Sequence, residues 1–354
     1  MQNKPLVSVL MPCYNAEAFV EEALLSILNQ TYRNLEVIAI NDCSKDNTLG
    51  VLEKIAAKDS RVKIFNNDTN LKLIETLNKG IDLCSGIYIA RMDADDISLP
   101  ERIEKEVSFL EQNADYDIVS TNFSTFRTGK KKLYPHVNPS KFEDIQAFTL
   151  FKSCVCHPAV MIRKSMFSRF NLRFEEDYLH VEDYALWSKA VYLTKIANIN
   201  ESLLHYRVHG SQISTKHEQE QLENKKKVFI IHCNHLGLRK DPEFLDIYAS
   251  VAESVPKESS FEYLEKCESF MLDLIDLNKR KPFCSHTYLQ NMLSLHWLRC
   301  CANSRLGLKV LKKCFSSTLY RKENYKTQDY IILYVKCIFR MEYKKSFIYK
   351  LIFR

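Results

Sequence analysis

The chain has 354 residues, of which 46% are hydrophobic and 27% are charged, as in an ordinary globular protein of one or two domains. This composition argues against a disordered, collagen-like or polytopic membrane protein. Only seven residues are glycine, and no two are spaced as in the glycine-rich loops that cradle nucleotide phosphates. Any nucleotide must therefore be bound in another way.

The charge is distributed unevenly along the chain. Residues 305–354 contain 13 Lys and Arg against 3 Asp and Glu, a net charge of +10. The first 304 residues contain 37 against 41, a net charge of −4. The N-terminal residues lack the pattern of a signal peptide, and no apolar run reaches the ~18 residues needed to cross a bilayer. We therefore expect a cytoplasmic protein with reduced cysteines and an anionic partner for its basic end.

The first hundred residues alternate between short apolar runs and amphipathic segments, which predicts strands and helices in turn. The expected strands are Leu6 to Met11 (ending at Pro12), Leu35 to Ile40, Val62 to Phe65 and Ile87 to Met92. The expected helices are Ala16 to Asn29, Thr48 to Lys58 (capped by the loop from Asn41 to Ser44) and Lys72 to Cys84. Such alternation predicts an α/β fold with a mostly parallel sheet flanked by helices.

Farther along the chain, a strand is expected between Asp115 and Ser124 and a loop between residues 129 and 138. Cys154, Cys156 and His157 are spaced wrongly for a structural zinc site, so the two cysteines are interpreted as buried strand residues. From about Lys216 the pattern becomes helical. We therefore expect an α/β domain over residues 1–215 and a mainly helical region over residues 216–354.

Polar residues follow three of the expected strands: Pro12 to Asn15, Asn41 with Asp42, and Asp93 to Asp96. In open α/β sheets, ligands bind beyond the carboxyl ends of the strands. Because parallel strands end at the same edge, we expect these residues to form one site.

Asp93 and Asp95 are two residues apart, so in extended backbone their side chains point the same way. Two carboxylates with Asp96 beside them repel one another unless a cation lies between them. Oxygen ligands of this kind suit Mg²⁺ or Mn²⁺, which would neutralise a diphosphate leaving group. The alternative is a solvated acidic loop that caps the next helix.

A second acidic pair, Glu182 and Asp183, precedes an amphipathic segment. A carboxylate there would be a helix cap or a general base kept ionised by the helix dipole. Farther on, Arg207 suits a phosphate, and His209 would donate to phosphate or bind a metal unless it is an ordinary surface histidine.

Five segments in this order resemble the family 2 glycosyltransferases of the GT-A fold, especially bacterial enzymes that extend lipopolysaccharide or capsular glycans. They are VSVLMPCYNAEAFVEEALLSILNQTY, LEVIAINDCSKDNT, GIYIARMDADDISLPERIEKEV, VEDYALW and YRVHGSQIS. The resemblance covers residues 5 to 215 and does not extend to the C-terminal part.

The resemblance implies a set of donor-binding residues. Asp42 would read the nucleobase, usually uracil. Pro12, Tyr14 and Glu17 would line the nucleoside side, and Arg91, Asp93 and Ala94 would lie beside the donor. Arg207 falls where relatives contact the diphosphate. Two residues depart from the usual pattern: Asn41, where many members have Asp, and Cys13, where Thr, Ser or Val is common.

The resemblance also implies the metal site and the catalytic base. Asp95 would be the direct ligand of Mn²⁺ or Mg²⁺, with Asp93 nearer the ribose and His209 as a further ligand. Asp183 would be the general base, with Glu182 as its neighbour. The implied reaction is transfer of a sugar, with inversion, from a nucleoside diphosphate sugar (expected to be a UDP-sugar) to a hydroxyl of a glycan or lipid-linked glycan.

Three rival interpretations are weaker. A nucleotidylyltransferase needs a glycine-rich basic loop after the first strand, and this chain has Pro12 to Asn15 there. A GT-B transferase needs two Rossmann-like halves and a later glycine-rich phosphate loop, and this sequence shows neither. A non-catalytic nucleotide-sugar-binding protein is disfavoured because the acidic positions are all present.

The C-terminal tail interleaves aromatic residues with Lys and Arg from Tyr330 onward. This pattern suits an interfacial helix lying on anionic lipid. The alternative is an ordinary helix that packs its apolar face on the body and exposes its charges. No motif indicates nucleic acid binding.

Overall fold

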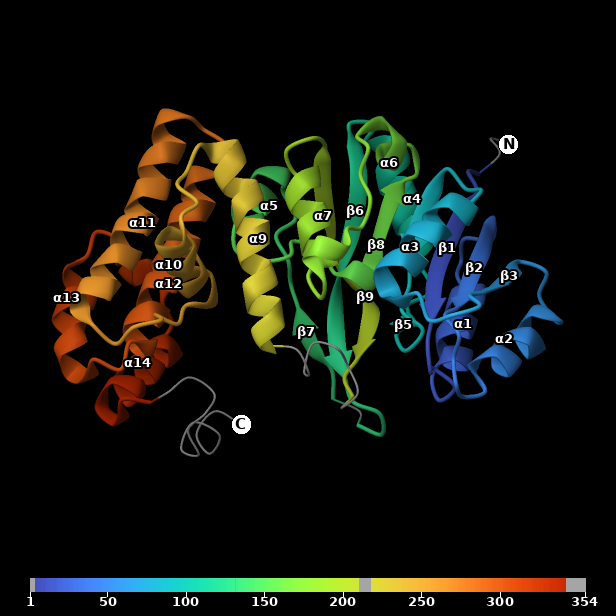
Figure 1. Cartoon of the computed structure of the whole chain (residues 1–354), viewed down its shortest axis with the longest axis horizontal. Helices are drawn as coiled ribbons and strands as arrows, with labels where there is room; N and C mark the ends of the chain where they lie inside the picture. The colour runs from blue at the N-terminus through green and yellow to red at the C-terminus, as the bar shows by residue number, and fades with distance from the viewer. Residues whose placement is uncertain (1–3, 131, 210–217, 342–354) are drawn as a thin grey trace. The chain divides into compact units, whose positions relative to one another are not determined.

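The computed structural model describes residues 4–130, 132–209 and 218–341. The chain divides into two compact units, the first made of residues 1–145 with 153–224 and the second of residues 146–152 with 225–354. The boundary predicted after residue 215 lies outside the described residues. Each unit is described separately below (Figure 1).

The first unit is an α/β structure. Within the described residues its strands form one nine-stranded sheet with the order β3-β2-β1-β4-β8-β6-β9-β5, and β7 pairs with β6. The strands are β1 Val7–Cys13, β2 Leu35–Asn41, β3 Val62–Asn66, β4 Tyr88–Arg91, β5 Ile97–Ser98, β6 Tyr116–Phe126, β7 Tyr134–His136, β8 Val160–Arg163 and β9 Lys195–Arg207. The helices that follow or separate them are α1 Val20–Leu28, α2 Thr48–Ala56, α3 Lys72–Leu83, α4 Arg102–Gln112, α5 Phe142–Thr149, α6 Ser165–Arg169 and α7 Glu182–Ala190.

Strands β3, β2, β1 and β4 are parallel, as the alternation of strands and helices predicts. β8 pairs antiparallel with both β4 and β6, and β6 then pairs parallel with β9. The long β9 lies between β6 and the edge strand β5. Its last residue, Arg207, is thereby brought to the acidic segment that follows β4.

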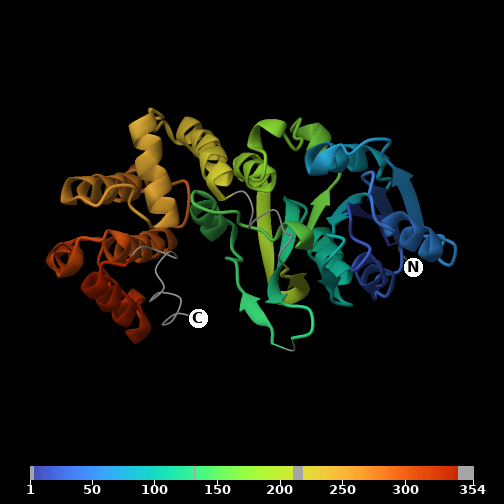
Figure 2. The same ribbon diagram turned by 60° about the horizontal axis from the view of Figure 1, so that its bottom comes forward.

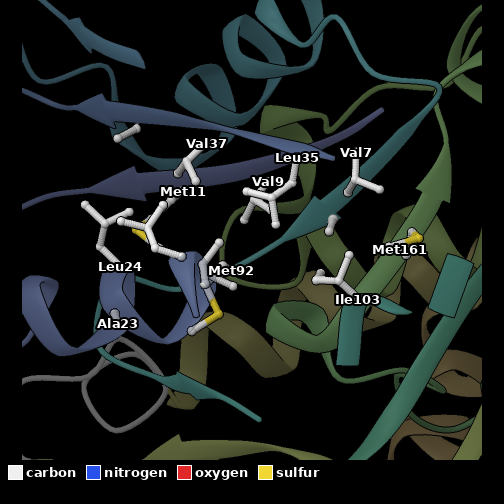
Figure 3. Packing of buried hydrophobic residues seen from close by; sticks show 14 of the residues in the cluster. Val7, Val9, Met11, Ala23, Leu24, Leu35, Val37, Met92, Ile103 and Met161 are labelled. Carbon is white, nitrogen blue, oxygen red and sulfur yellow. The ribbon is translucent and has the colours of Figure 1, made fainter. Parts of the chain in front are cut away.

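The core of this unit follows from the two-residue period of β1. Val7, Val9 and Met11 belong to one buried cluster that includes side chains of β2, α1 and α4 (Figure 3). Leu10 points to the opposite face, where a Cβ on Gly80 of α3 would lie 2.2 Å from its Cδ1 atom. Helices therefore cover both faces of the sheet, and polar groups collect where the strands end.

Several expected details are wrong. β1 continues through Pro12 to Cys13, because the fixed φ angle of proline fits extended backbone and only its N–H group is lost. Helix α2 is not capped by the loop from Asn41 to Ser44, because the Thr48 N–H donates instead to Asp46 Oδ1 at 3.1 Å. β7 lies in the segment expected to be a loop. Cys154 and Cys156 are buried as expected, but they precede β8 and are not strand residues.

The second unit includes residues 146–152 with the end of α5, and its other described helices are coloured yellow to red in Figures 1 and 2. They are α9 Glu218–Leu236, which begins in the first unit, α10 Pro242–Glu253, α11 Phe261–Arg280, α12 His286–Asn303, α13 Val310–Ser316 and α14 Thr327–Phe339. Asp241 and Ser260 cap α10 and α11 through their side chains. None of the helices in the described residues has the length and apolarity required to span a bilayer.

Candidate active site

The ends of β1 and β2 are held together by hydrogen bonds between their loops. Asn15, in the left-handed region with φ 49°, accepts from the Lys45 N–H at 2.8 Å and donates its own N–H to Ser44 Oγ at 3.0 Å. Glu17 Oε2 accepts from the Asn47 N–H at 3.1 Å. Tyr14 is 45% exposed at the tip of the first loop. The loops expected on the nucleoside side of the site are therefore fixed to each other.

Asp42 is the most constrained residue of this group. It is buried, and its Oδ1 atom accepts from Asn67 Nδ2 and from the Leu71 N–H, both at 2.8 Å. Asn67 in turn accepts from Lys79 Nζ at 2.7 Å. The chain thus holds one carboxylate in a single orientation beyond the end of β2.

The two departures from the family pattern have structural explanations. Asn41 uses its amide to donate to Asn66 Oδ1 at 3.2 Å and to accept from the Ser44 N–H at 3.3 Å, so it ties β2 to β3 and to the loop. Cys13 has its side chain in the core cluster, and burial raises the pKa of its thiol to about 12. Neither departure changes the contacts of the Asp42 carboxylate with Asn67 and Leu71 described above.

Asp93, Asp95 and Asp96 form the only metal-type cluster of acids found among the described residues. Their carboxylate oxygens lie within 4.8 Å of one another. Burial, followed by repulsion from Asp93, raises the pKa of Asp95, and burial with repulsion from both neighbours raises the pKa of Asp96 well above its ordinary value. Ala94 is buried between them in the sequence. The chain therefore concentrates negative charge at the end of β4.

The donors present fit a divalent cation. They are hard carboxylate oxygens, and Asp96 Oδ2 is buried with no hydrogen-bond partner in the part of the chain that the structure describes. His209 adds an imidazole, because its Nε2 atom lies 2.8 Å from Asp95 Oδ2 and its ring packs 5.2 Å from that of Phe19. His209 is thus not an ordinary surface histidine. Asp95, Asp93 and His209 are the residues that would hold Mn²⁺ or Mg²⁺.

Arg207 is only 3% exposed and binds protein groups. Its guanidinium donates to the Asp95 carbonyl at 2.6 Å and to Glu22 Oε2 at 2.5 Å. It also lies between two rings, 4.8 Å from the centroid of Phe19 and 4.6 Å from that of Phe126. The backbone N–H of Arg207 donates to Asp96 Oδ1 at 2.8 Å. This placement favours positioning of the acidic segment over direct contact with a diphosphate.

Arg91 connects the two acidic groups of the site. Its Nη1 atom lies 2.5 Å from Asp93 Oδ1, and the guanidinium is buried. Its positive charge opposes the rise in the pKa of Asp95 and, at the same time, in the pKa of Asp183. The end of β4 and the start of α7 therefore share one electrostatic environment.

Glu182 and Asp183 begin α7. Burial, followed by the charge of Asp183, raises the pKa of Glu182 to about 7. Burial also raises the pKa of Asp183, although the Tyr184 N–H donates to its Oδ1 atom at 2.6 Å. Desolvation outweighs the local donors, so the start of the helix does not lower the pKa of Asp183 below its ordinary value. A raised pKa suits a carboxylate that must accept a proton near neutral pH.

Sequence reasoning missed two residues of this site. Asn67 orients Asp42, and no motif marks it. His157 Nδ1 lies 3.9 Å from Asp183 Oδ2, and burial followed by repulsion from Arg91 lowers the pKa of its imidazole well below the ordinary value. In the sequence, His157 stands out only because it follows Cys154 and Cys156 in a pattern that suggests zinc. Its position after two buried cysteines and before Pro158 gave no signal that it approaches α7.

Comparisons with known proteins identify the family of the chain. The model of the family "Glycosyl transferase family 2" matches residues 8–170. An uncharacterized glycosyltransferase of Haemophilus influenzae is 40% identical over 257 residues, which cover 67% of this chain and 77% of that protein. The O-antigen biosynthesis glycosyltransferase WbnJ of Escherichia coli is 32% identical over 218 residues, covering 58% of this chain and 80% of the relative.

Two kinds of solved structure share the fold at low identity. Staphylococcus aureus TarS (residues 1–349), crystallised with UDP-GlcNAc, aligns with a TM-score of 0.56 and 17% identity over 89% of this chain and 93% of its own. The Pyrobaculum calidifontis mannosyltransferase PcManGT, in complex with GDP-Man and Mn²⁺, aligns with a TM-score of 0.51 and 14% identity over 90% and 89%. These likenesses confirm the predicted GT-A fold with its C-terminal helical extension. With its acidic sheet edge and a relative that matches two thirds of it at 40% identity, the chain belongs to glycosyl transferase family 2 and is a glycosyltransferase.

Proposed function

We propose that this glycosyltransferase transfers a sugar, with inversion, from a UDP-sugar to a hydroxyl of a glycan or lipid-linked glycan acceptor. The observation that carries the proposal is the pair of acidic groups around Arg91: one suited to a cation and a diphosphate, the other with raised pKa values suited to a base. Sugar transfer needs the group that stabilises the departing diphosphate and the base that activates the acceptor hydroxyl to lie close together.

Asp183 is assigned as the general base, with Glu182 beside it. Its carboxylate takes the proton of the acceptor hydroxyl as that oxygen forms a bond to the anomeric carbon. The bond from that carbon to the diphosphate oxygen breaks on the opposite face, so the configuration inverts. General base catalysis of this kind typically contributes ~10²–10⁴-fold to the rate.

Asp95, Asp93 and His209 are assigned to the cation, Mn²⁺ or Mg²⁺. A bound divalent ion would stabilise the negative charge of the departing diphosphate. Arg207 holds the Asp95 carbonyl and Asp96 in place, and Arg91 fixes Asp93. These arginines keep the carboxylates together before the donor arrives, which is the condition for electrostatic preorganisation.

The nucleotide is proposed to be UDP because the carboxylate of Asp42 is held as a hydrogen-bond acceptor, which matches the N3–H group of uracil. Pro12, Tyr14, Glu17 and Ala94 are proposed to line the donor. The acceptor is proposed to belong to lipopolysaccharide, capsule or a related surface polysaccharide. The name of the WbnJ relative supports this class of acceptor.

Two substitutions test the assignment. Asp183→Asn should keep UDP binding and abolish transfer, whereas the matched change at an exposed carboxylate, Asp177→Asn, should leave both unchanged. Normal turnover by Asp183→Asn would remove the base assignment. Asp95→Ala should lose the part of UDP affinity that depends on Mn²⁺, and an unchanged dependence would reject the metal assignment.

The donor can be identified by incubating the protein with a panel of UDP-sugars and Mn²⁺ but no acceptor, with GDP-mannose as the contrasting donor. We expect slow hydrolysis of one UDP-sugar. Hydrolysis of one UDP-sugar identifies the donor and separates an enzyme from a protein that only binds nucleotide sugars. Hydrolysis of GDP-mannose alone would refute the assignment of UDP as the nucleotide. We also propose that the protein works at the inner face of the cytoplasmic membrane, where a lipid-linked acceptor would lie.

A further inference from the structure

Helix α14 has an unusual distribution of side chains. Four large apolar residues on it are exposed: Ile331 is 54% exposed, Tyr334 43%, Ile338 57% and Phe339 55%. On the same helix Lys336 is only 4% exposed and donates to Asn303 Oδ1 at 2.7 Å. The helix thus shows apolar groups to solvent while it buries a lysine, the reverse of an ordinary surface helix.

The four exposed residues form a continuous surface, called here the apolar stripe. They are separated by three, four and one positions, so at 100° per residue they lie on one side of the helix. The opposite side carries Leu333 and Cys337, which are buried, and α14 packs on α12 within the second unit. The apolar stripe is therefore additional to the face that holds α14 in its unit. The alternative of a helix that packs an apolar face on the body holds for Leu333 and Cys337, but it does not account for the exposed apolar stripe.

The sequence around the apolar stripe is basic. Residues 305–341 contain nine Lys and Arg against two acidic residues, Glu323 and Asp329, although Lys313 pairs with Glu265 and Glu268 and Lys336 is buried. Lys326 and Arg340 at the two ends of α14 are exposed, and so is Lys322, five residues before the helix. The Asp329 carboxylate accepts from the Lys326 N–H at 2.8 Å and so belongs to the helix cap. An apolar surface with cations at both ends matches a surface of acyl chains and anionic headgroups.

A second copy of the chain is a poorer occupant for the same surface. A two-fold contact through the apolar stripe would place the cations of one copy against those of the other, because such a contact uses the same patch twice. Like charges facing each other disfavour association. Anionic lipid instead attracts every one of these cations.

We propose that the apolar stripe of α14 is a docking face for the anionic leaflet of a membrane, with Ile331, Tyr334, Ile338 and Phe339 inserted among the acyl chains. Lys322, Lys326 and Arg340 then lie at the level of the headgroups. This inference deepens the membrane contact proposed above and assigns it to particular residues. It does not depend on the sugar-transfer chemistry.

The test is sedimentation of the full chain with vesicles of phosphatidylcholine alone and of phosphatidylcholine mixed with phosphatidylglycerol. The wild type should bind the anionic vesicles preferentially, and added salt should weaken that binding. The triple variant Ile331→Ser/Ile338→Ser/Phe339→Ser should bind them about tenfold or more weakly, because the inserted apolar area is lost. The control Phe261→Ser changes an exposed phenylalanine of α11 in the same unit and should bind as the wild type does.

A second measurement keeps the apolar surface intact. Phe339→Trp should shift its fluorescence to shorter wavelength when anionic vesicles are added, and Phe261→Trp should not. The two native tryptophans, Trp187 and Trp297, are buried and give a constant background. An absent shift, or binding by the triple variant equal to wild type, would overturn the proposal.

Three further outcomes are decisive. A wild-type dimer that becomes monomeric in the triple variant without vesicles would show that a second copy covers the apolar stripe, which overturns the proposal. Retained hydrolysis of the donor sugar by a triple variant that no longer binds vesicles would support it. Vesicle binding by Asp183→Asn at the wild-type level would also support it, even if the proposed reaction failed.

Discussion

The ionisation of Glu182 gives a prediction that separates the site from the rest of the fold. Its pKa is raised from the ordinary 4.5 to about 7, first by burial and then by the charge of Asp183. At 1.36 kcal/mol per pKa unit this difference corresponds to about 3 kcal/mol. Because Glu182 is partly exposed, solvent screening reduces the expected effect to about 2 kcal/mol.

The sign follows from which state loses its proton first. As the pH rises from about 4.5 to about 7, Glu182 ionises in the unfolded chain while it stays protonated in the folded protein. The unfolded state is therefore favoured progressively, and the wild type loses stability across this interval. Glu182→Gln removes the effect. We expect this variant to be more stable than wild type at pH 8.5 and nearly equal to it close to pH 4.5.

The assay is thermal unfolding without donor or metal at pH 5 and pH 8.5. For a unit of this size about 2 kcal/mol corresponds to roughly 4–8 °C in Tm, so Glu182→Gln should exceed the wild type by that amount at the higher pH only. The control is Glu176→Gln, which changes an exposed carboxylate six residues earlier. An equal difference at both pH values, or none, would refute the conclusion that the ionised form of Glu182 is destabilised by its site.

Three further predictions follow from the described contacts. Arg207→Gln should weaken the activation of donor hydrolysis by Mn²⁺ more than metal-free UDP binding, because it releases the Asp95 carbonyl and the Glu22 carboxylate; a Mn²⁺ titration that matches the wild type would contradict this. Gly86→Ala should lower the free energy of unfolding in urea by about 1–3 kcal/mol, because the new Cβ would lie 2.6 Å from the Leu6 carbonyl oxygen. The control Ser85→Ala, at the adjacent exposed residue, should change this free energy little. Glu36→Gln should lower the free energy of unfolding by about 1–3 kcal/mol near pH 7. Burial raises the pKa of Glu36, but hydrogen bonds from Lys63, Ser8 and the Ser85 N–H lower it overall. The loss of stability should therefore disappear as the pH falls below about 4.5, and a loss independent of pH would argue against this.

The α/β part of the fold was predictable because its signals are local. β1 and β2 are short, mostly apolar segments, and α1 and α3 repeat apolar residues at helical spacing, so the local pattern was enough to place them. The meeting of Asp42 and the Asp93 to Asp96 segment at one edge also follows, because parallel strands end on the same side. β8 and β9 were not predicted. Their pairing joins residues far apart in the chain, and nothing local distinguishes Lys195 to Arg207 from other mixed segments.

The chemistry of single residues was less accessible from the sequence. Arg207 looked like a phosphate ligand because arginine suits phosphate, but the fold surrounds it with Phe19, Phe126 and protein acceptors. Asp183 begins a helix, whose dipole favours a lowered pKa, but burial raises the pKa of this carboxyl instead. His157 became visible only when β8 and α7 brought it close to Asp183.

The sequence by itself determined which residue types occur and in what order, and this was sufficient for the family, the parallel strands β1 to β4 and the list of acids. Only the tertiary structure decided which of these acids are desolvated, which cation lies near each, and which face of α14 is open to solvent. The reason is physical: secondary structure depends on side chains a few positions apart, whereas desolvation and charge coupling depend on every group within several ångströms, whatever its place in the chain.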